Sequence, residues 1–338
     1  MKEAILFKGL KDRLLECNVC QRRCVIAEGG LGWCKTRKNQ NGRLYSLIYG
    51  KVASLAISPI EKKPMYHFYP GSMWLSLGTF GCNFRCPGCQ NYELSFADIN
   101  KGLVPIEEIR PKQSIALAKR YRAKGISWTY NEPTIWFEYT LDSARMAKEE
   151  GLLTNYVTNG FITEEALDAI GPYLDSFRVD LKGFSQVFYS QICHVDDFKG
   201  ILEVTKRAKF KWAMHVEIVT NVISGYSDDE AQLTGIAQWI CEELGKDTPW
   251  HITQFVPHLK LSHVNPTPLP TLEKARQIGL EVGLDYVYIG NIPGHPGENT
   301  YCPGCNSLVI ERDGYSVRKI NLNKDRCPEC GKVIAGRF

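Results

Sequence analysis

The chain lacks any apolar run of the roughly 20 residues that a membrane-spanning helix needs. Its start, residues 1–8, lacks the long apolar segment and the small-residue cleavage site of a secretory signal. Strong net charge is also missing, because the formal charge is only +4 and blocks of like charge are short. We therefore expect a cytoplasmic protein with no membrane contact, and the charge alone does not indicate a nucleic-acid partner.

Low-complexity linkers and internal repeats are absent as well, so the 338 residues are expected to fold as one large domain with appendages. Hydrophobic residues make up 44% and charged residues 23%, which is ordinary for a soluble globular protein. A single α/β barrel of about 250 residues fits within this length.

What the chain has in quantity is cysteine, with thirteen residues. In a reducing compartment this number indicates metal sites rather than disulfides. The cysteines fall into three sets, four within residues 17–34, three within 82–89 and four within 302–330. Cys193 and Cys241 remain, and we interpret both as buried small hydrophobic residues.

The central set, Cys82, Cys86 and Cys89, has the spacing C-x3-C-x2-C, with no fourth cysteine nearby. A short loop of this kind can supply thiolates to three irons of an iron–sulfur cubane and leave the fourth iron open. An open coordination position is where a substrate or cofactor binds. The missing fourth ligand therefore indicates catalysis rather than simple electron transfer.

Around this loop, strand-like and helix-like segments alternate from about residue 73 to residue 292. The expected strands are 73–77, 126–130, 152–158, 176–181, 214–220, 250–255 and 286–289, and the expected helices include 111–123, 133–150, 163–170, 229–244 and 272–282. Repeated βα units predict a parallel sheet with right-handed crossovers. Six or seven units fit an incomplete barrel better than a closed eightfold one.

Polar side chains follow the expected strands at one edge, which is the ligand-binding edge of parallel α/β proteins. These residues are Asn131, Glu132, Asn159, Asp180, Lys182 and Asn221. Each alone could be a helix cap or a turn residue, but their common position favours a functional site. His251, within an expected strand, is by itself more typical of a packed, hydrogen-bonded histidine.

With these residues in place, the chain resembles the radical S-adenosylmethionine (SAM) enzymes. The cysteine loop after the first strand is similar to their cluster-binding motif. The resemblance implies a [4Fe-4S] cluster whose open iron chelates the amino and carboxylate groups of SAM. It also implies one-electron cleavage of SAM to a 5′-deoxyadenosyl radical, which abstracts hydrogen from a substrate. A reductant such as ferredoxin or flavodoxin would then be a partner.

The resemblance extends to single segments. Residues 130–133 stand where the family has Gly-Gly-Glu-Pro, which implies that Glu132 receives the SAM ammonium. Residues 158–160 and 179–182 resemble segments of the glycyl-radical-enzyme (pyruvate formate-lyase) activating enzymes, so that Asp180 and Lys182 are expected near the SAM carboxylate and ribose. Residues 221–225 resemble an adenine-contacting segment. The implied cofactor-binding set is Asn131, Glu132, Asn159, Asp180, Lys182, Asn221 and, by family position, His251.

A subgroup similarity runs nearly end to end, to the radical SAM protein of the AmmeMemoRadiSam system. It is carried by motifs that are weak singly and specific in this order, residues 59–64, 66–68, 70–72, 86–91, 129–133, 249–253, 288–291 and 299–302. It implies a partial (β/α)6-type barrel and an unidentified substrate, which could be a protein, an RNA or a small molecule.

The C-terminal set consists of two CPxC knuckles, Cys302 with Cys305 and Cys327 with Cys330. Residues 307–311 and 315–322 between them can pair as a hairpin. Paired knuckles around a hairpin are typical of a zinc ribbon, in which four thiolates close a structural site. A second iron–sulfur cluster is the rival interpretation.

The N-terminal set, Cys17, Cys20, Cys24 and Cys34, is less regular. Zinc is favoured here too, but an auxiliary cluster is a closer rival because thiolates suit either metal. We expect a Cys-rich extension over residues 1–70, the barrel over 71–298 and a zinc-ribbon-like module over 299–338.

The sequence thus predicts a radical SAM enzyme of unknown substrate. The alternatives are a glycyl-radical-enzyme activase, a radical RNA-modifying enzyme and, in another class, a non-catalytic metal-stabilised scaffold. The polar residues at the strand ends argue against the scaffold.

Overall fold

The computed structural model describes residues 1–97 and 105–338, and its centre is an eight-stranded sheet with the order β16-β15-β14-β13-β12-β11-β9-β8. Seven strands are parallel, and β8 pairs antiparallel with β9. The strands are β8 (Ser54–Pro59), β9 (Met73–Gly78), β11 (Gly125–Trp128), β12 (Leu153–Thr158), β13 (Ser176–Asp180), β14 (His215–Val222), β15 (Trp250–Gln254) and β16 (Val287–Gly290). Within the described residues β8 and β16 are edge strands, so the barrel is incomplete.

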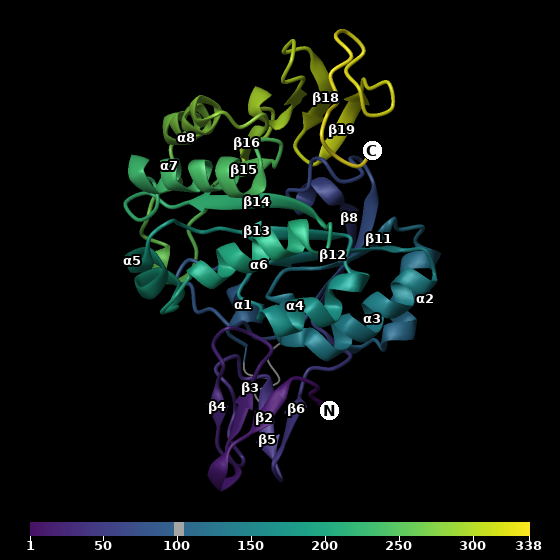
Figure 1. Cartoon of the computed structure of the whole chain (residues 1–338), viewed down its shortest axis with the longest axis vertical. Coiled ribbons are helices and arrows are strands. Elements are labelled where there is room, and N and C mark those ends of the chain that lie inside the picture. The colour runs from purple at the N-terminus through teal and green to yellow at the C-terminus, as the bar shows by residue number, and fades with distance from the viewer. Residues whose placement is uncertain (98–104) are drawn as a thin grey trace.

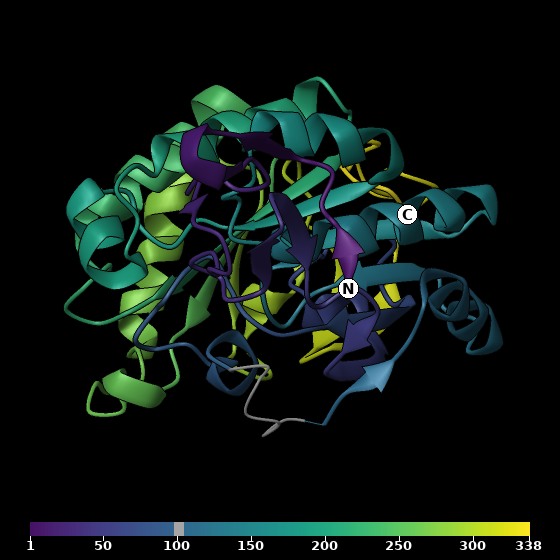
Figure 2. The same ribbon diagram turned by 90° about the horizontal axis from the view of Figure 1, so that it is seen from below.

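Helices cover the outer side of this sheet (Figures 1 and 2). They are α2 (Pro111–Arg120), α3 (Phe137–Glu149), α4 (Glu164–Ile170), α6 (Lys199–Phe210), α7 (Glu230–Trp239) and α8 (Leu269–Val282), whereas the short α1 (Tyr92–Ser95) and α5 (Gln186–Phe188) lie in the loops after β9 and β13. Local chemistry sets their starts: Thr163 caps α4 and Asp229 caps α7 through side-chain oxygens that accept backbone N–H groups. No helix among the described residues is long and apolar enough to cross a membrane.

The parallel strands and the five helices expected from the sequence are confirmed, with small shifts at their ends. These strands mix apolar residues with buried polar ones, such as Thr154 and Asn155 in β12, and their alternation with helix-like segments made them recognisable. The antiparallel β8 was not expected. It lies inside the range assigned to the N-terminal extension, yet it belongs to the main sheet.

The N-terminal segment forms two small sheets below the barrel, at the opposite end of the long axis from the C-terminal hairpin (Figure 1). Their strands are β1 (Lys2–Glu3), β2 (Phe7–Gly9), β3 (Leu15–Cys17), β4 (Val25–Ile26), β5 (Arg37–Gln40) and β6 (Arg43–Ser46), and the short β7 (Lys51–Val52) pairs with β10 (Glu107–Glu108).

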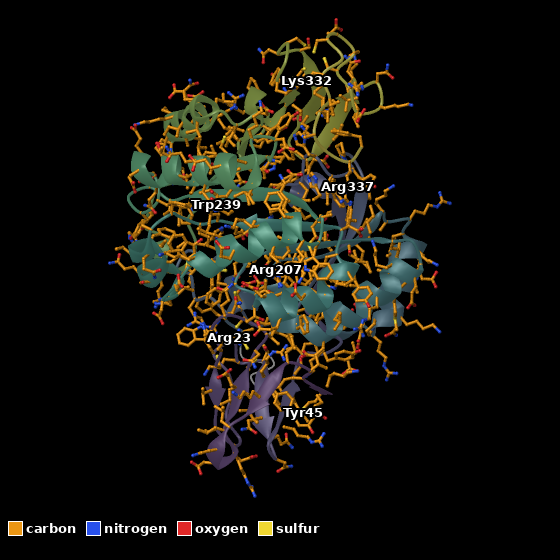
Figure 3. All side chains as sticks on the ribbon, viewed as in Figure 1. Arg23, Tyr45, Arg207, Trp239, Lys332 and Arg337 are labelled. Carbon is orange, nitrogen blue, oxygen red and sulfur yellow. The ribbon has the colours of Figure 1, made fainter. Side chains whose placement is uncertain are left out.

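Three ion pairs join this segment to the barrel, one of them between Lys2 of β1 and Asp142 of α3 at 3.5 Å. Arg37 is buried and donates to both carboxylate oxygens of Glu138 in α3, at 2.9 and 2.8 Å. Arg23 pairs with Glu165 of α4 at the surface, where Figure 3 labels it. The Arg37–Glu138 pair is desolvated and so specifies how the segment docks. The more exposed pairs add little to the free energy of unfolding.

The C-terminal module contains the predicted hairpin, β18 (Leu308–Asp313) and β19 (Ser316–Ile320), with β17 (Thr300–Tyr301) as a third strand. Its turn contains Gly314 at φ +59°, a left-handed conformation that suits glycine. After the hairpin the chain returns to the barrel, and the backbone N–H of Arg337 donates to the His67 carbonyl. The expected hairpin is therefore confirmed.

A buried carboxylate closes the barrel on the side that faces the C-terminal module. The oxygens of Glu217 in β14 accept the backbone N–H groups of Tyr66 and His67, at 2.9 and 2.8 Å. They also lie 2.9 Å from His215 Nε2 and 2.6 Å from His251 Nε2. Although burial opposes a charge, the two histidines hold the pKa of Glu217 well below its usual range. The stability that the Glu217 carboxylate contributes is therefore present at neutral pH and is lost on strong acidification.

Replacing Glu217 with glutamine tests this closure. The amide NH2 must face a backbone N–H that has no other acceptor there, so we expect the unfolding free energy to fall by about 2–4 kcal/mol. Thermal unfolding followed by circular dichroism measures the change. Glu203→Gln, on the exposed face of α6, is the matched control and should change stability by less than about 0.5 kcal/mol. Equal effects of the two variants would contradict the assigned role of Glu217.

Candidate active site

The three cysteines of the central set lie on the loop between β9 and α1, and all three are partly buried. Gly81 begins this loop at φ +79°, and a Cβ there would lie 2.6 Å from the Cys34 carbonyl oxygen. Only glycine permits this close approach of the N-terminal segment. The cysteine loop is therefore held against both the sheet and the N-terminal segment.

One large cavity opens beside this loop, with about 1790 Å³ of empty space counted together with its opening to solvent. It is lined by Cys82, Cys86 and Cys89, and by Asn131, Glu132, Asn159, Asp180, Lys182 and Asn221. These side chains come from the cysteine loop and from the carboxyl ends of β11, β12, β13 and β14. The structure thus brings together nine of the residues that the sequence analysis assigned to the site.

Glu132 is the most completely hydrogen-bonded of them. Its Oε1 accepts Thr134 N at 3.0 Å, Thr134 Oγ1 at 2.5 Å and Thr158 Oγ1 at 2.7 Å. Its Oε2 accepts Asn159 N at 2.8 Å and no other donor within the described part of the chain. Burial raises the pKa of Glu132 despite these donors. One oxygen is therefore committed to structure, while the other retains a lone pair for a ligand.

Two asparagines position the cysteine loop. Asn131 accepts Thr79 N through Oδ1 at 3.0 Å and donates through Nδ2 to the Gly81 carbonyl at 2.9 Å. Asn159 donates through Nδ2 to Asn83 Oδ1 at 2.8 Å. These contacts connect the ends of β11 and β12 to the residues on either side of Cys82, so that amide groups fix the loop.

Asp180 lies between two cations, forming ion pairs with Arg178 and with Lys182, the latter at 3.3 Å. Burial alone would raise its pKa, but Arg178 and Lys182 hold the pKa of Asp180 below its usual value. Partial burial likewise opposes the charge of Lys182, yet the attraction of Asp180 and nearby thiols raises its pKa. The cavity wall thus carries fixed charges of both signs.

Asn221 and His251 differ in whether their side chains reach the cavity. Asn221 lines the cavity, and its Nδ2 donates to Thr253 Oγ1 and to the Gln254 carbonyl, both at 3.0 Å. His251 does not line the cavity, and the expectation that it belongs to the cofactor site is corrected here. It lies two residues before the cavity-lining Thr253 on the same face of β15, and so about 7 Å deeper in the barrel. There it contacts Glu217.

Sequence reasoning missed several cavity residues. Arg178 stands two residues before Asp180 on β13, so the two-residue period of a strand could have identified it. Lys63 is buried, donates to Ser58 Oγ at 2.6 Å, and burial lowers its pKa to about 7. A lysine so perturbed in a cavity is a candidate functional residue. Cys193 is buried as expected, but its sulfur lies 4.0 Å from that of Cys86, which no sequence pattern indicated.

The C-terminal cysteines gather at single-ion spacing. The sulfur atoms of Cys302, Cys305, Cys327 and Cys330 all lie within 4.8 Å of one another, with pairs at 3.5 and 3.6 Å. Zinc–sulfur bonds of about 2.3 Å in a tetrahedron put sulfurs about 3.8 Å apart. These residues therefore suit one tetrahedral metal ion.

Comparisons with known proteins agree with this geometry. The family model described as the radical SAM superfamily matches residues 77–234, from β9 into α7. The uncharacterized protein MJ0808 of Methanocaldococcus jannaschii is 44% identical over 99% of each chain. A second protein of that organism, MJ1632, provisionally named a glycyl-radical enzyme activating enzyme, is 23% identical over 64% of this chain and 79% of its own.

A solved structure has the same fold. The crystal structure of a radical SAM methyltransferase from Sphaerobacter thermophilus superposes with a TM-score of 0.50 and 16% identity, covering 68% of this chain and 71% of that one. The family match and the similarity to MJ1632 show that the chain belongs to the radical SAM superfamily, whose members are enzymes that use a [4Fe-4S] cluster and S-adenosylmethionine.

Proposed function

We propose that Cys82, Cys86 and Cys89 ligate the [4Fe-4S] cluster, and that SAM binds beside it against Asn131, Glu132, Asn159, Asp180, Lys182 and Asn221. The observation that supports this assignment is the single cavity that all nine residues line. When bound, the reduced cluster and SAM supply a 5′-deoxyadenosyl radical, which abstracts hydrogen from a substrate that the residues do not identify.

The chain's own residues divide the work of holding the cofactor. The free lone pair of Glu132 Oε2 suits the SAM ammonium. The Arg178–Asp180–Lys182 group offers both a cation for a carboxylate and an anion for hydroxyl groups. Asn131 and Asn159 hold the cysteine loop, so that the ligands do not need to be ordered when the cluster binds.

The substrate enters, in this proposal, through the open side of the barrel. The cavity is lined from both edges of the sheet, by Ser58 of β8 and by Asn291 after β16. It extends to residues 62–64 and to Tyr315 at the tip of the C-terminal hairpin. The C-terminal module therefore shapes the mouth of the cavity, and a structural zinc ion at its four cysteines would keep that tip in place.

Activation of a glycyl-radical enzyme is the second candidate function. It is supported by the similarity to MJ1632 over most of the length of that protein. Its substrate would be a glycine-bearing segment of a partner protein, entering by the same mouth. Either function requires a one-electron donor, for which ferredoxin and flavodoxin are our candidates.

The proposed cluster ligands can be tested by SAM cleavage. After anaerobic reconstitution with iron and sulfide, we expect dithionite to drive formation of 5′-deoxyadenosine by the wild type, measured by liquid chromatography and mass spectrometry. Cys86→Ala should form none, because the cluster loses a ligand. Cys241→Ala, a cysteine outside all three sets, should retain wild-type activity. Equal product from wild type and Cys86→Ala would overturn the assignment.

A second test concerns SAM affinity. Asp180→Asn removes the anion between Arg178 and Lys182, and we expect SAM binding to weaken by roughly tenfold or more, since hydrogen bonds to charged groups contribute about 1.5–3 kcal/mol. Anaerobic calorimetric titration measures the affinity. Asp285→Asn, which removes a carboxylate at the opposite ends of the strands, is the control and should leave affinity unchanged. Unaltered binding by Asp180→Asn would show that Asp180 does not contact the cofactor.

A further inference from the structure

We infer that Cys17, Cys20, Cys24 and Cys34 hold a second [4Fe-4S] cluster, next to the first, rather than the zinc ion that their sequence favours. This inference goes beyond the proposed function, which needs only the cluster at the central cysteines.

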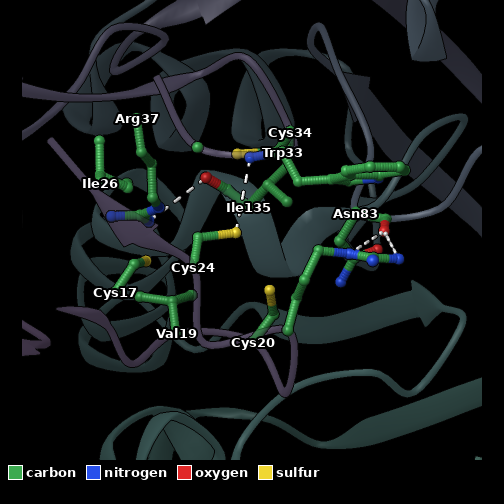
Figure 4. Close-up of a pocket in the computed structure, with 12 residues that line it drawn as sticks. Cys17, Val19, Cys20, Cys24, Ile26, Trp33, Cys34, Arg37, Asn83 and Ile135 are labelled. Atoms are coloured by element: carbon green, nitrogen blue, oxygen red, sulfur yellow. Dashed lines mark hydrogen bonds between the residues drawn. The ribbon is translucent and has the colours of Figure 1, made fainter. Parts of the chain in front are cut away.

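The four cysteines line one cavity, separate from the SAM cavity, with about 330 Å³ of empty space counted together with its opening. Figure 4 shows their side chains arranged around this space, with Trp33 and Ile135 among the apolar residues that complete it. Cys17, Cys20 and Cys34 are buried, and Cys24 is partly exposed. Four thiols around one enclosed, largely apolar space suit a thiolate-ligated metal centre.

The separation of the sulfur atoms distinguishes a cluster from a single ion. Around one zinc ion the sulfurs stand about 3.8 Å apart. Among the described residues only the C-terminal set brings three or more such ligand atoms within 4.8 Å of one another, so no three sulfurs of the N-terminal set lie that close together. A cubane binds each thiolate to a different iron, which requires wider spacing.

The sulfur spacing of the N-terminal set can be compared with that of the other two cysteine sets. The central cysteines, at the cluster loop of the radical SAM fold, also fail the single-ion spacing, whereas the C-terminal cysteines meet it. The N-terminal set thus shares the wider spacing of the central set.

Backbone contacts oppose collapse of the N-terminal set onto a smaller ion. Cys17 belongs to β3, and its N–H donates to the Cys24 carbonyl at 3.0 Å. Cys20 forms a β-bridge with Ile162 of the barrel. The Cys34 carbonyl lies against Gly81. Cys20 and Cys34 are therefore held against the barrel, whereas Cys17 and Cys24 are joined to each other, and bringing the four backbone positions closer together would break some of these contacts.

An unpartnered donor independently supports a thiolate-ligated centre in this cavity. Arg37 lines the cavity with 2% of its side chain exposed, and its terminal nitrogens bond Glu138 and the Ile135 carbonyl. Its Nε has no hydrogen-bond partner within the described residues. A buried N–H without an acceptor costs about 1–3 kcal/mol. Cluster sulfurs and cysteine thiolates are acceptors that would satisfy it.

The two clusters would be close neighbours. Asn83 lines the N-terminal cavity and the adjoining Cys82 lines the SAM cavity, and consecutive Cα atoms are 3.8 Å apart. Arg22, in the N-terminal segment, donates through Nε and a terminal nitrogen to the Asn83 carbonyl, at 3.1 and 3.0 Å. One short backbone segment thus separates the two metal centres.

Metal content of the full chain after anaerobic reconstitution tests the inference. We expect about eight iron atoms and one zinc per wild-type chain. The triple variant Cys82→Ala/Cys86→Ala/Cys89→Ala should retain about four iron atoms, and Cys20→Ala/Cys24→Ala should also retain about four. Cys241→Ala should match the wild type. A triple variant with no iron and two zinc ions would overturn the inference, whether or not the wild type cleaves SAM.

Electron paramagnetic resonance tests the position. The reduced triple variant should give a cluster signal that SAM does not change, and Cys20→Ala/Cys24→Ala should give one that SAM does change. The fully reduced wild type should show the broadened spectrum of two interacting spins. A wild-type spectrum equal to the sum of the two variant spectra would contradict neighbouring clusters.

Discussion

The buried carboxylate of Glu132 is the contact on which the active-site edge depends. It joins the end of β11 to the end of β12 through Thr134, Thr158 and the Asn159 backbone. Parallel strands are paired along their length, but nothing in a sheet fixes the loops beyond it. A charged acceptor with several short bonds in a low-dielectric site supplies that constraint.

Further hydrogen bonds connect Glu132 to the cysteine loop. Asn159 holds Asn83, whose neighbour is Cys82, and Arg22 holds the carbonyl of the same Asn83. The cysteine loop is thereby fixed from the sheet on one side and from the N-terminal segment on the other. The N-terminal segment is thus part of the active-site architecture, because it supports the loop that carries the proposed cluster ligands.

Much of this arrangement was predictable, and the failures have physical causes. Strand positions followed from the alternation of strand-like and helix-like segments, and polar residues such as Asp180 followed from the rule that loops after parallel strands meet at one edge. His251 entered the cofactor set by family position alone, whereas its own position within a strand indicated a packed, hydrogen-bonded histidine, in agreement with its contact with Glu217. The partners of Glu132 and the contact between Cys86 and Cys193 join segments far apart in the chain. A family motif likewise names a residue without saying how many of its lone pairs the fold already uses.

The three cysteine sets also show what sequence spacing alone does not predict, which is the metal centre that each set binds. Each set contains short spacings of two or three residues between cysteines, and zinc and iron–sulfur sites share such spacings. What separates them is the distance between sulfurs, and tertiary contacts decide that distance. In the C-terminal module the two knuckles are free to converge on one ion. In the N-terminal set Cys34 lies against Gly81, Cys20 pairs with Ile162, and Cys17 and Cys24 are joined to each other, so the thiols surround a space instead of a point. Anchoring of Cys20 and Cys34 by the barrel is thus what favours a cluster over an ion in this set.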